Sequence, residues 1–301
     1  MRTDAFISKI SGLSAEDEKF EELKKGLPLG EDSVGNVLLS QKRERPLTVR
    51  HTCVSGLHRG NFIRRFLLTV SCLYEKSEAT FLVISPKAEY GELLRLRSMD
   101  VTVPYINGKS DLNLAIETLK ELLRQREYGK GYPHLFLVLD GLEDLPDCNR
   151  NGDLEEYREI FDYLTRRMDV DVISGVDLMH SIFSGYPGAF VGVGNCLVTT
   201  REDGKADVTY VGDDASMSLP VPMRYPNEPS FMETVIYFNA LSVGSVPDAN
   251  TANPANGSNN AFASMNTVNA INTVSASSET GARRATETED GADATDPTKQ
   301  F

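Results

Sequence analysis

The sequence has no long apolar run, no closely spaced cysteines and no excess of basic residues, and each absence excludes a class of protein. No stretch approaches the ~18 consecutive apolar residues of a membrane-spanning helix, and the N-terminus lacks the apolar core of a signal peptide. The four histidines have no spacing typical of a zinc site, so we expect no metal centre of that kind. We expect a soluble, cytoplasmic chain without direct membrane insertion, whose association with a membrane would depend on a partner.

The four cysteines form no C-x-x-C pair, and three of them lie in apolar runs. A thiol in such a run behaves as a small hydrophobic side chain, so we expect reduced core residues. The cysteines are Cys53, Cys72, Cys148 and Cys196.

The charge balance is acidic, with 31 Lys and Arg residues against 44 Asp and Glu residues and a net charge of −13. Residues 241–301 contribute three basic and seven acidic residues, so that subtracting −4 leaves −9 for the rest. Sequence-independent DNA affinity depends on Lys and Arg side chains, and the charge therefore does not support DNA as a partner. We interpret three small basic clusters as solvated faces: 42–45, Arg64-Arg65 and Arg166-Arg167.

Composition divides the chain into three parts. Residues 1–26 form a charged amphipathic segment, with a helix expected over 14–25 and Ser14 as its N-cap. Residues 27–240 hold enough apolar residues for one sizeable core or two small ones. Residues 241–301 are mostly Asn, Ala, Ser, Thr and Gly with almost no aromatic residues, a composition that predicts a disordered polar, acidic tail.

Strands and helices alternate within the middle part. Apolar runs without alternation at 80–85 and 134–139 predict strands that are buried on both faces of a parallel sheet. The alternation predicts a three-layer α/β domain with a mostly parallel sheet. We also expect a turn at 26–30, strands at 34–39, 47–54, 101–106, 170–174, 189–199 and 206–212, and helices at 61–74, 89–96, 112–126, 154–167 and 176–183.

Residues 47–68 (LTVRHTCVSGLHRGNFIRRFLL) predict a strand, a glycine-containing turn and a helix. Such an arrangement directs backbone N–H groups at one point and can bind phosphate. A working phosphate-binding loop reads G-x-x-x-x-G-K-[ST]. Here Gly56 and Gly60 are separated by only three residues and are followed by Asn61 and Phe62, so the ammonium and the hydroxyl are missing and the loop is one residue short.

Ligands of open parallel sheets bind beyond the carboxyl ends of the strands. We therefore expect residues 55–60, residues 85–87 and Asp140 to lie together at that edge. Two interpretations of the glycine loop stay open. It is either only a tight strand-to-helix turn, which we favour, or an anion site to which His58 and Arg59 contribute cationic contacts.

Two further alternatives concern the same edge. Lys87 is a candidate to replace the missing lysine of the loop, because it follows a neighbouring strand. The acidic cluster of Asp140, Glu143 and Asp144 is either a Mg²⁺ site or a solvated strand end, and we favour the strand end.

Four segments in order resemble the FtsK/SpoIIIE family of RecA-like P-loop ATPases, which includes DNA translocases, conjugative coupling proteins and the EssC-type motors of type VII secretion. The resemblance covers about residues 27–213. The segments are LPLGEDSVGNVLL, RHTCVSGLHRGNFIRRFL, FLVISPKAEYGELL and HLFLVLDGLEDL.

The resemblance implies that the motifs have degenerated. Asn61 occupies the position of the Walker A lysine, and Phe62 occupies that of the Ser or Thr. Asp140 matches the Walker B aspartate, but Gly141 replaces the glutamate that activates water. The strand at 170–175 also lacks the family's sensor residues. The resemblance therefore implies no catalytic residue and no metal ligand, with ATP and Mg²⁺ as cofactors only if the degenerate site still binds them.

We interpret the chain as a degenerate ATPase domain that acts as a binding or assembly module of a translocation or secretion machine. Its expected partner is a homologous FtsK/EssC-type ATPase or further copies of itself. The alternatives are an active motor that moves DNA or protein, with Arg166 or Arg167 as an arginine finger, and an unrelated α/β nucleotide-binding protein. The candidate nucleotide contacts are Gly56, His58, Arg59, Gly60, Asn61, Phe62 and Asp140.

Overall fold

The computed structural model describes residues 5–40, 50–128, 131–144, 169–175, 196–210, 217–226 and 231–244. The strands are β1 (Pro28–Glu31), β2 (Val37–Leu39), β3 (Arg50–Ser55), β4 (Ala79–Ile84), β5 (Asp100–Thr102), β6 (His134–Asp140), β7 (Val170–Gly175), β8 (Cys196–Thr200), β9 (Lys205–Tyr210) and β10 (Val221–Arg224). The helices are α1 (Ala5–Ser11), α2 (Glu18–Gly26), α3 (Arg59–Val70), α4 (Lys109–Tyr128), α7 (Phe231–Gly244) and the 3₁₀ segments η1 (Ala88–Arg95) and η2 (Leu142–Asp144).

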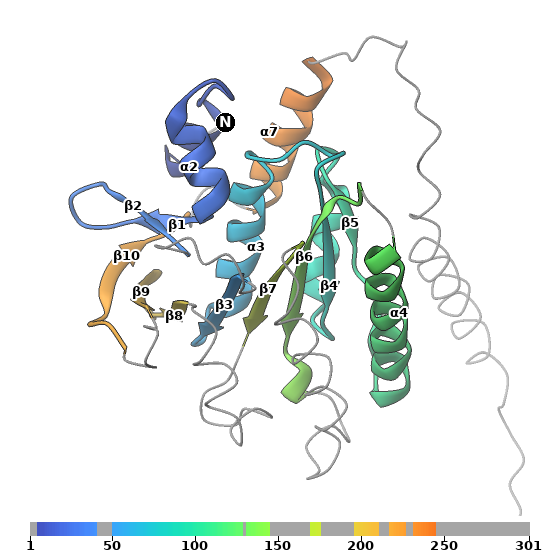
Figure 1. The fold of residues 1–301 in the computed structure, drawn as a ribbon. Helices are drawn as coiled ribbons and strands as arrows, with labels where there is room; N and C mark the ends of the chain where they lie inside the picture. The colour runs from blue at the N-terminus through green and yellow to red at the C-terminus, as the bar shows by residue number, and fades with distance from the viewer. Residues whose placement is uncertain are drawn as a thin grey trace, which may run out of the picture.

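All these strands belong to one sheet, in the order β2-β1-β10-β9-β8-β3-β7-β6-β4-β5 (Figure 1). The part from β8 to β5 is parallel throughout. The part from β8 to β2 continues the sheet with antiparallel pairs. The predicted α/β class with a mostly parallel sheet is confirmed.

Helices cover both faces of the parallel part, as the predicted three layers require. Alternate residues of β6 divide between two cores: Phe136 packs in the cluster that includes α3, and Leu137 packs in the cluster that includes α4. Figure 1 shows α3 and α4 on opposite sides of β6 and β4. Because each face of β6 contacts a helix, its sequence has no polar alternation.

The N-terminal segment forms two helices where one was expected. The sequence pattern predicted a helix over 14–25 that Ser14 caps, but α2 begins at Glu18 and α1 precedes it. The Ser14 hydroxyl accepts a hydrogen bond from the Glu16 N–H at 3.3 Å within the intervening turn. Local side-chain to backbone bonding of this kind competes with helix formation, and it explains why the cap prediction was wrong.

The turn predicted at 26–30 was also wrong, because Pro28–Glu31 forms strand β1. Its neighbours in the sheet are β2, which follows directly in sequence, and β10, which lies far along the chain. Glycine and proline favour a turn locally, and the pairing with β10 overrides that preference.

Other predictions had correct elements with shifted ends. The helix expected from Asn61 begins at Arg59, and the helical segment at 89–96 is the 3₁₀ segment η1. Strand β10 and helix α7 were not expected. The helices predicted at 154–167 and 176–183 lie outside the described residues. The tail predicted over 241–301 begins too early, because α7 continues to Gly244, and the rest of it lies outside the described residues. Within the described part, no helix has the length and apolarity needed to cross a bilayer.

Candidate functional site

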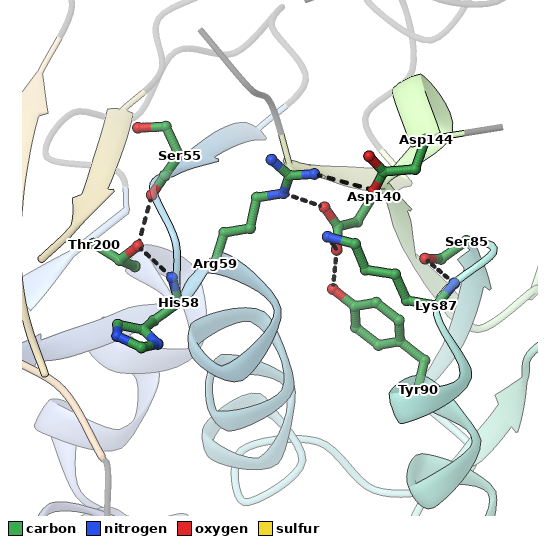
Figure 2. Close-up of polar contacts among 9 residues, drawn as sticks. All are labelled: Ser55, His58, Arg59, Ser85, Lys87, Tyr90, Asp140, Asp144 and Thr200. Atoms are coloured by element: carbon green, nitrogen blue, oxygen red, sulfur yellow. Dashed lines mark hydrogen bonds and ion pairs between the residues drawn. The ribbon is translucent and has the colours of Figure 1, made fainter. Parts of the chain in front are cut away.

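The carboxyl ends of three parallel strands build the candidate site. Asp140 is the last residue of β6, the loop 56–60 joins β3 to α3, and residues 85–87 follow β4 (Figure 2). The strand register places Asp140 opposite Gly175 of β7, and Gly175 opposite Val54 of β3. The structure therefore brings together the segments that the sequence predicted to gather.

The carboxylate of Asp140 is the centre of the site, and it is fully buried. The Arg59 Nε–H donates to its Oδ1 at 2.8 Å, and the Lys87 Nζ lies 3.1 Å from its Oδ2. The Tyr90 hydroxyl also donates to Oδ2, at 2.7 Å. Two cationic groups and one neutral donor, from two different segments, thus converge on one carboxylate (Figure 2).

Tyr90 remains a proton donor in this environment. Its side chain is fully buried. Burial, together with the negative charge of Asp140, raises the pKa of Tyr90 well above its ordinary value. The phenol therefore keeps its proton and its hydrogen bond to Asp140 throughout the physiological pH range.

Glycines next to Asp140 leave room for this arrangement. A Cβ on Gly175 would lie 1.9 Å from the Asp140 Oδ1, so no other residue fits opposite this carboxylate. Gly141 has a φ of +72°, and a Cβ there would lie 2.7 Å from the Lys87 Cε. The position at which the resemblance implies a catalytic glutamate thus has a left-handed backbone packed against a lysine stem, which a glutamate could not adopt without strain.

The loop between β3 and α3 is held by contacts within the chain. The Thr200 hydroxyl donates to the Ser55 carbonyl at 2.8 Å and accepts from the His58 N–H at 3.3 Å. The Arg59 N–H donates to the Gly56 carbonyl at 3.3 Å. Two of the N–H groups that would face a phosphate therefore have internal acceptors, an arrangement typical of a tight turn.

The candidate contacts predicted from the sequence do not all face the site. Phe62 packs in the core instead, with its ring centroid 5.1 Å from that of Tyr225. The His58 imidazole is exposed and points away from Asp140 (Figure 2). Asn61 is half-buried in α3. Among the described contacts of the predicted residues, the hydrogen bond from the Arg59 side chain is the one that reaches Asp140.

Sequence reasoning missed Tyr90, Thr200 and Gly175. Tyr90 stands in an apolar pattern within η1 and resembles a core residue. Thr200 and Gly175 belong to strands β8 and β7, and their relation to the loop and to Asp140 depends on the strand register. The placement of Lys87 beside the site, by contrast, was predicted from its position after strand β4.

Mg²⁺ is the metal that the resemblance to P-loop ATPases implies, and the residues present do not fit it. Mg²⁺ requires near-octahedral oxygen ligands, several of which are usually waters. Both oxygens of Asp140 are engaged by the donors of Arg59, Lys87 and Tyr90, and the carboxylate has no exposed surface. Asp144 lies on the outer side, 3.9 Å from the Arg59 Nη2. No group of three potential metal ligands is present among the residues that the structure describes.

The sequence matches no family model and no curated protein. The fold is similar to that of the cytoplasmic domain of the type VII secretion ATPase EccC from Thermomonospora curvata, with a TM-score of 0.54 and 14% identity. This match covers 79% of the present chain and 34% of the EccC chain. The cytoplasmic domain of EssC has a TM-score of 0.48 at 10% identity, covering 73% of this chain and 50% of that chain. The conjugation coupling protein TcpA of pCW3 has a TM-score of 0.45 at 13% identity, covering 75% and 73%.

The chain therefore has the same fold as this EccC domain, as the resemblance to the FtsK/SpoIIIE family implied. The described strands and the Gly56–Gly60 loop supply the framework of such a domain. The match spans about one third of the length of the EccC chain.

Proposed function

We propose that this chain is a degenerate ATPase domain that serves as a binding or assembly module of a translocation or secretion machine and does not turn over ATP. The single observation that supports this most directly is the engagement of Asp140 by Arg59 and Lys87. The similarity of the fold to one part of the EccC chain supports a role in a translocation or secretion machine. In this proposal, the partner is a homologous FtsK/EssC-type ATPase or another copy of the chain, and any membrane association depends on that partner.

The losses at the site are large on the scale of catalysis. Phosphoryl transfer depends on positioning and on neutralising the charge of the γ-phosphate. The chain has Asn61 in place of the lysine that contacts phosphate and Gly141 in place of the base. Each such group is typically worth about two or more orders of magnitude in rate. Losing them together removes catalysis on any useful timescale.

The Ser or Thr of the loop is replaced by Phe62, and a point mutation back to Ser or Thr would not restore the site. Phe62 extends from α3 into the core and packs against Tyr225, so a hydroxyl-bearing residue there would leave a cavity. Truncating a buried phenylalanine costs about 3–5 kcal/mol. The side chain at this position therefore contributes to the stability of the domain.

Titration calorimetry and a hydrolysis assay on the full chain test the loss of function. We expect Mg-ATP to bind more weakly than about 1 mM, the upper end of useful substrate affinities, and phosphate release to stay at background. Asp140→Asn is the matched variant, because it removes the carboxylate that matches the Walker B aspartate. An active motor, the alternative interpretation, predicts Mg²⁺-dependent hydrolysis that this variant abolishes.

Light scattering after size exclusion tests the assembly role. The full chain is measured alone and mixed with a catalytically intact FtsK/EssC-type ATPase of the same cell. We expect either a defined oligomer or a defined complex. A monomer that binds neither itself nor that ATPase at about 100 µM would overturn the assembly role, since useful transient interfaces are tighter than this.

A further inference from the structure

We propose that Arg59 and Lys87 are permanent counter-ions of Asp140, and that this cluster takes over the bridging role that a metal–nucleotide complex has in an active ATPase. The cluster holds the Gly56–Gly60 loop in one conformation whether or not nucleotide is present. The inference rests on the proposed function, since both require that no metal–nucleotide complex forms at this edge of the sheet.

The first observation is which segments the cluster joins. Arg59 belongs to the Gly56–Gly60 loop and is the first residue of α3, and its Nε lies 2.8 Å from Asp140. Lys87 and Tyr90 come from the turn after β4 and from η1, at 3.1 and 2.7 Å from the same carboxylate. In active P-loop ATPases, the phosphates and the metal connect the loop to the Walker B strand. Here, direct ion pairs make that connection.

The second observation is how closely the cluster is packed. The side chain of Arg59 is 12% exposed and that of Lys87 is 25% exposed, whereas Asp140 has no exposed surface. A methyl group at Gly175 or Gly141 would clash with Asp140 or with Lys87. Among the described residues, Arg59, Lys87 and Tyr90 therefore occupy the positions next to both carboxylate oxygens, where a hydrated metal would bind.

Removing a counter-ion from Asp140 is energetically costly. A buried carboxylate that loses its partners keeps its full desolvation cost, so removing one partner of a buried pair is strongly destabilising. A metal would have to displace two cations at short distance before it gained any ligand. The loop is therefore held with or without nucleotide, and it presents the same surface to a partner, including the exposed side chain of Leu57.

A double-mutant cycle on the full chain tests the cluster. Arg59→Gln, Asp140→Asn and the double variant are compared by thermal unfolding. We expect each single variant to lower the Tm by about 5–15 °C. The double variant should lose clearly less than the sum, because it leaves no unpaired charge from this pair. Additive losses, or single variants with an unchanged Tm, would overturn the inference.

The matched control is Arg201→Gln. Arg201 forms ion pairs with Asp203 and Asp207, but its side chain is 44% exposed. Exposed pairs contribute little, so its Tm should change by less than about 3 °C. A loss as large as that of Arg59→Gln would mean that any arginine substitution gives the effect, and would count against the cluster.

A second measurement does not depend on any variant being folded. Electron paramagnetic resonance follows free Mn²⁺ in the presence of the intact chain, with and without ATP. We expect the chain to leave the free Mn²⁺ signal unchanged up to millimolar protein. The inference would be refuted if the intact chain bound Mn²⁺ and the Asp140→Asn variant did not.

The two proposals fail in different ways. If the variants show no coupling while the intact chain neither binds nor hydrolyses ATP, the counter-ion inference is wrong and the proposed function stands. If the intact chain hydrolyses ATP while Mn²⁺ stays free of Asp140 and the cycle shows coupling, the proposed function is wrong and the cluster stands.

Discussion

Acidification should destabilise this protein through the buried histidine His51 in β3. Its side chain lies beneath the surface with 7% of the residue exposed, and its Nε2 is 2.8 Å from the Ser174 Oγ of β7. The neighbouring Cys53 thiol is neutral, because burial raises its pKa to about 11. Burial lowers the pKa of His51 from its ordinary value of 6.5 to about 4.

The difference between these two pKa values sets the size of the effect. Above pH 6.5, the imidazole is neutral in both the folded and the unfolded chain, and it contributes no pH dependence. Between pH 6.5 and about 4, the unfolded chain binds a proton that the folded chain does not, so stability falls as the pH falls. Each pKa unit is worth about 1.4 kcal/mol, which gives about 2 kcal/mol at pH 5 and a ceiling of about 3.4 kcal/mol.

Urea unfolding at pH 7.5 and at pH 5.0, followed by circular dichroism, measures this loss. His51→Gln keeps a polar partner for Ser174 but does not titrate, and all other titrating groups are common to both proteins. Wild type should therefore lose about 2 kcal/mol more than His51→Gln between the two pH values. Equal losses in the two proteins would refute the reasoning, because they would show that His51 is protonated as readily in the folded chain as in the unfolded chain.

Three substitutions should lower the free energy of unfolding for different steric or packing reasons. Gly175→Ala places a methyl group 1.9 Å from the Asp140 Oδ1, and we expect a loss of at least ~2 kcal/mol from overpacking alone, measured by urea unfolding. Gly56→Ala meets the Thr200 carbonyl oxygen at 2.4 Å and has a φ of +95°, so a loss of about 1–3 kcal/mol is expected in the same assay. Phe231→Ala removes a 6%-exposed ring that anchors α7, at a cost of about 3–5 kcal/mol in thermal unfolding.

Controls separate these causes from a general effect of substitution. Gly91→Ala is the matched glycine control, because a Cβ there meets no atom within 4 Å and should leave stability nearly unchanged. For Phe231, the Arg64 guanidinium lies 4.9 Å from the ring centroid, so Phe231→Leu should recover the packing but not the cation–π contact. If Gly175→Ala or Gly56→Ala were as stable as wild type, this would contradict the close approaches described above. If Phe231→Ala were as stable as wild type, this would contradict the anchoring of α7.

The sequence predicted the parallel core well. Strands β4 and β6 are apolar on both faces, and short apolar runs without alternation are typical of strands that helices cover on both sides. Prediction failed where pairing partners are remote in sequence. Strand β1 contains Pro28 and Gly30, residue types that locally predict a turn, and its pairing with β10 cannot be detected by local analysis.

The candidate site was predictable in part. The loop, Lys87 and Asp140 all follow strands, and the parallel arrangement brings them to one edge. The partners of Asp140 were not predictable. One interpretation of the sequence predicts Arg59 as a contact for an external anion, whereas the structure pairs it with a carboxylate of the same chain. Tyr90 has the apolar surroundings of a core residue, and its hydrogen bond to Asp140 depends on the position of η1.

The sequence by itself determined that positions 61, 62 and 141, which the resemblance aligns with the ATPase motifs, carry no ammonium, hydroxyl or carboxylate. Only the tertiary structure decided what happens to the carboxylate that remains. Asp140 pairs with cations that are 81 and 53 residues away in the chain, and the fold alone brings them within 3.1 Å. Residue identity limits which interactions a side chain can make, whereas packing and burial select the one that forms.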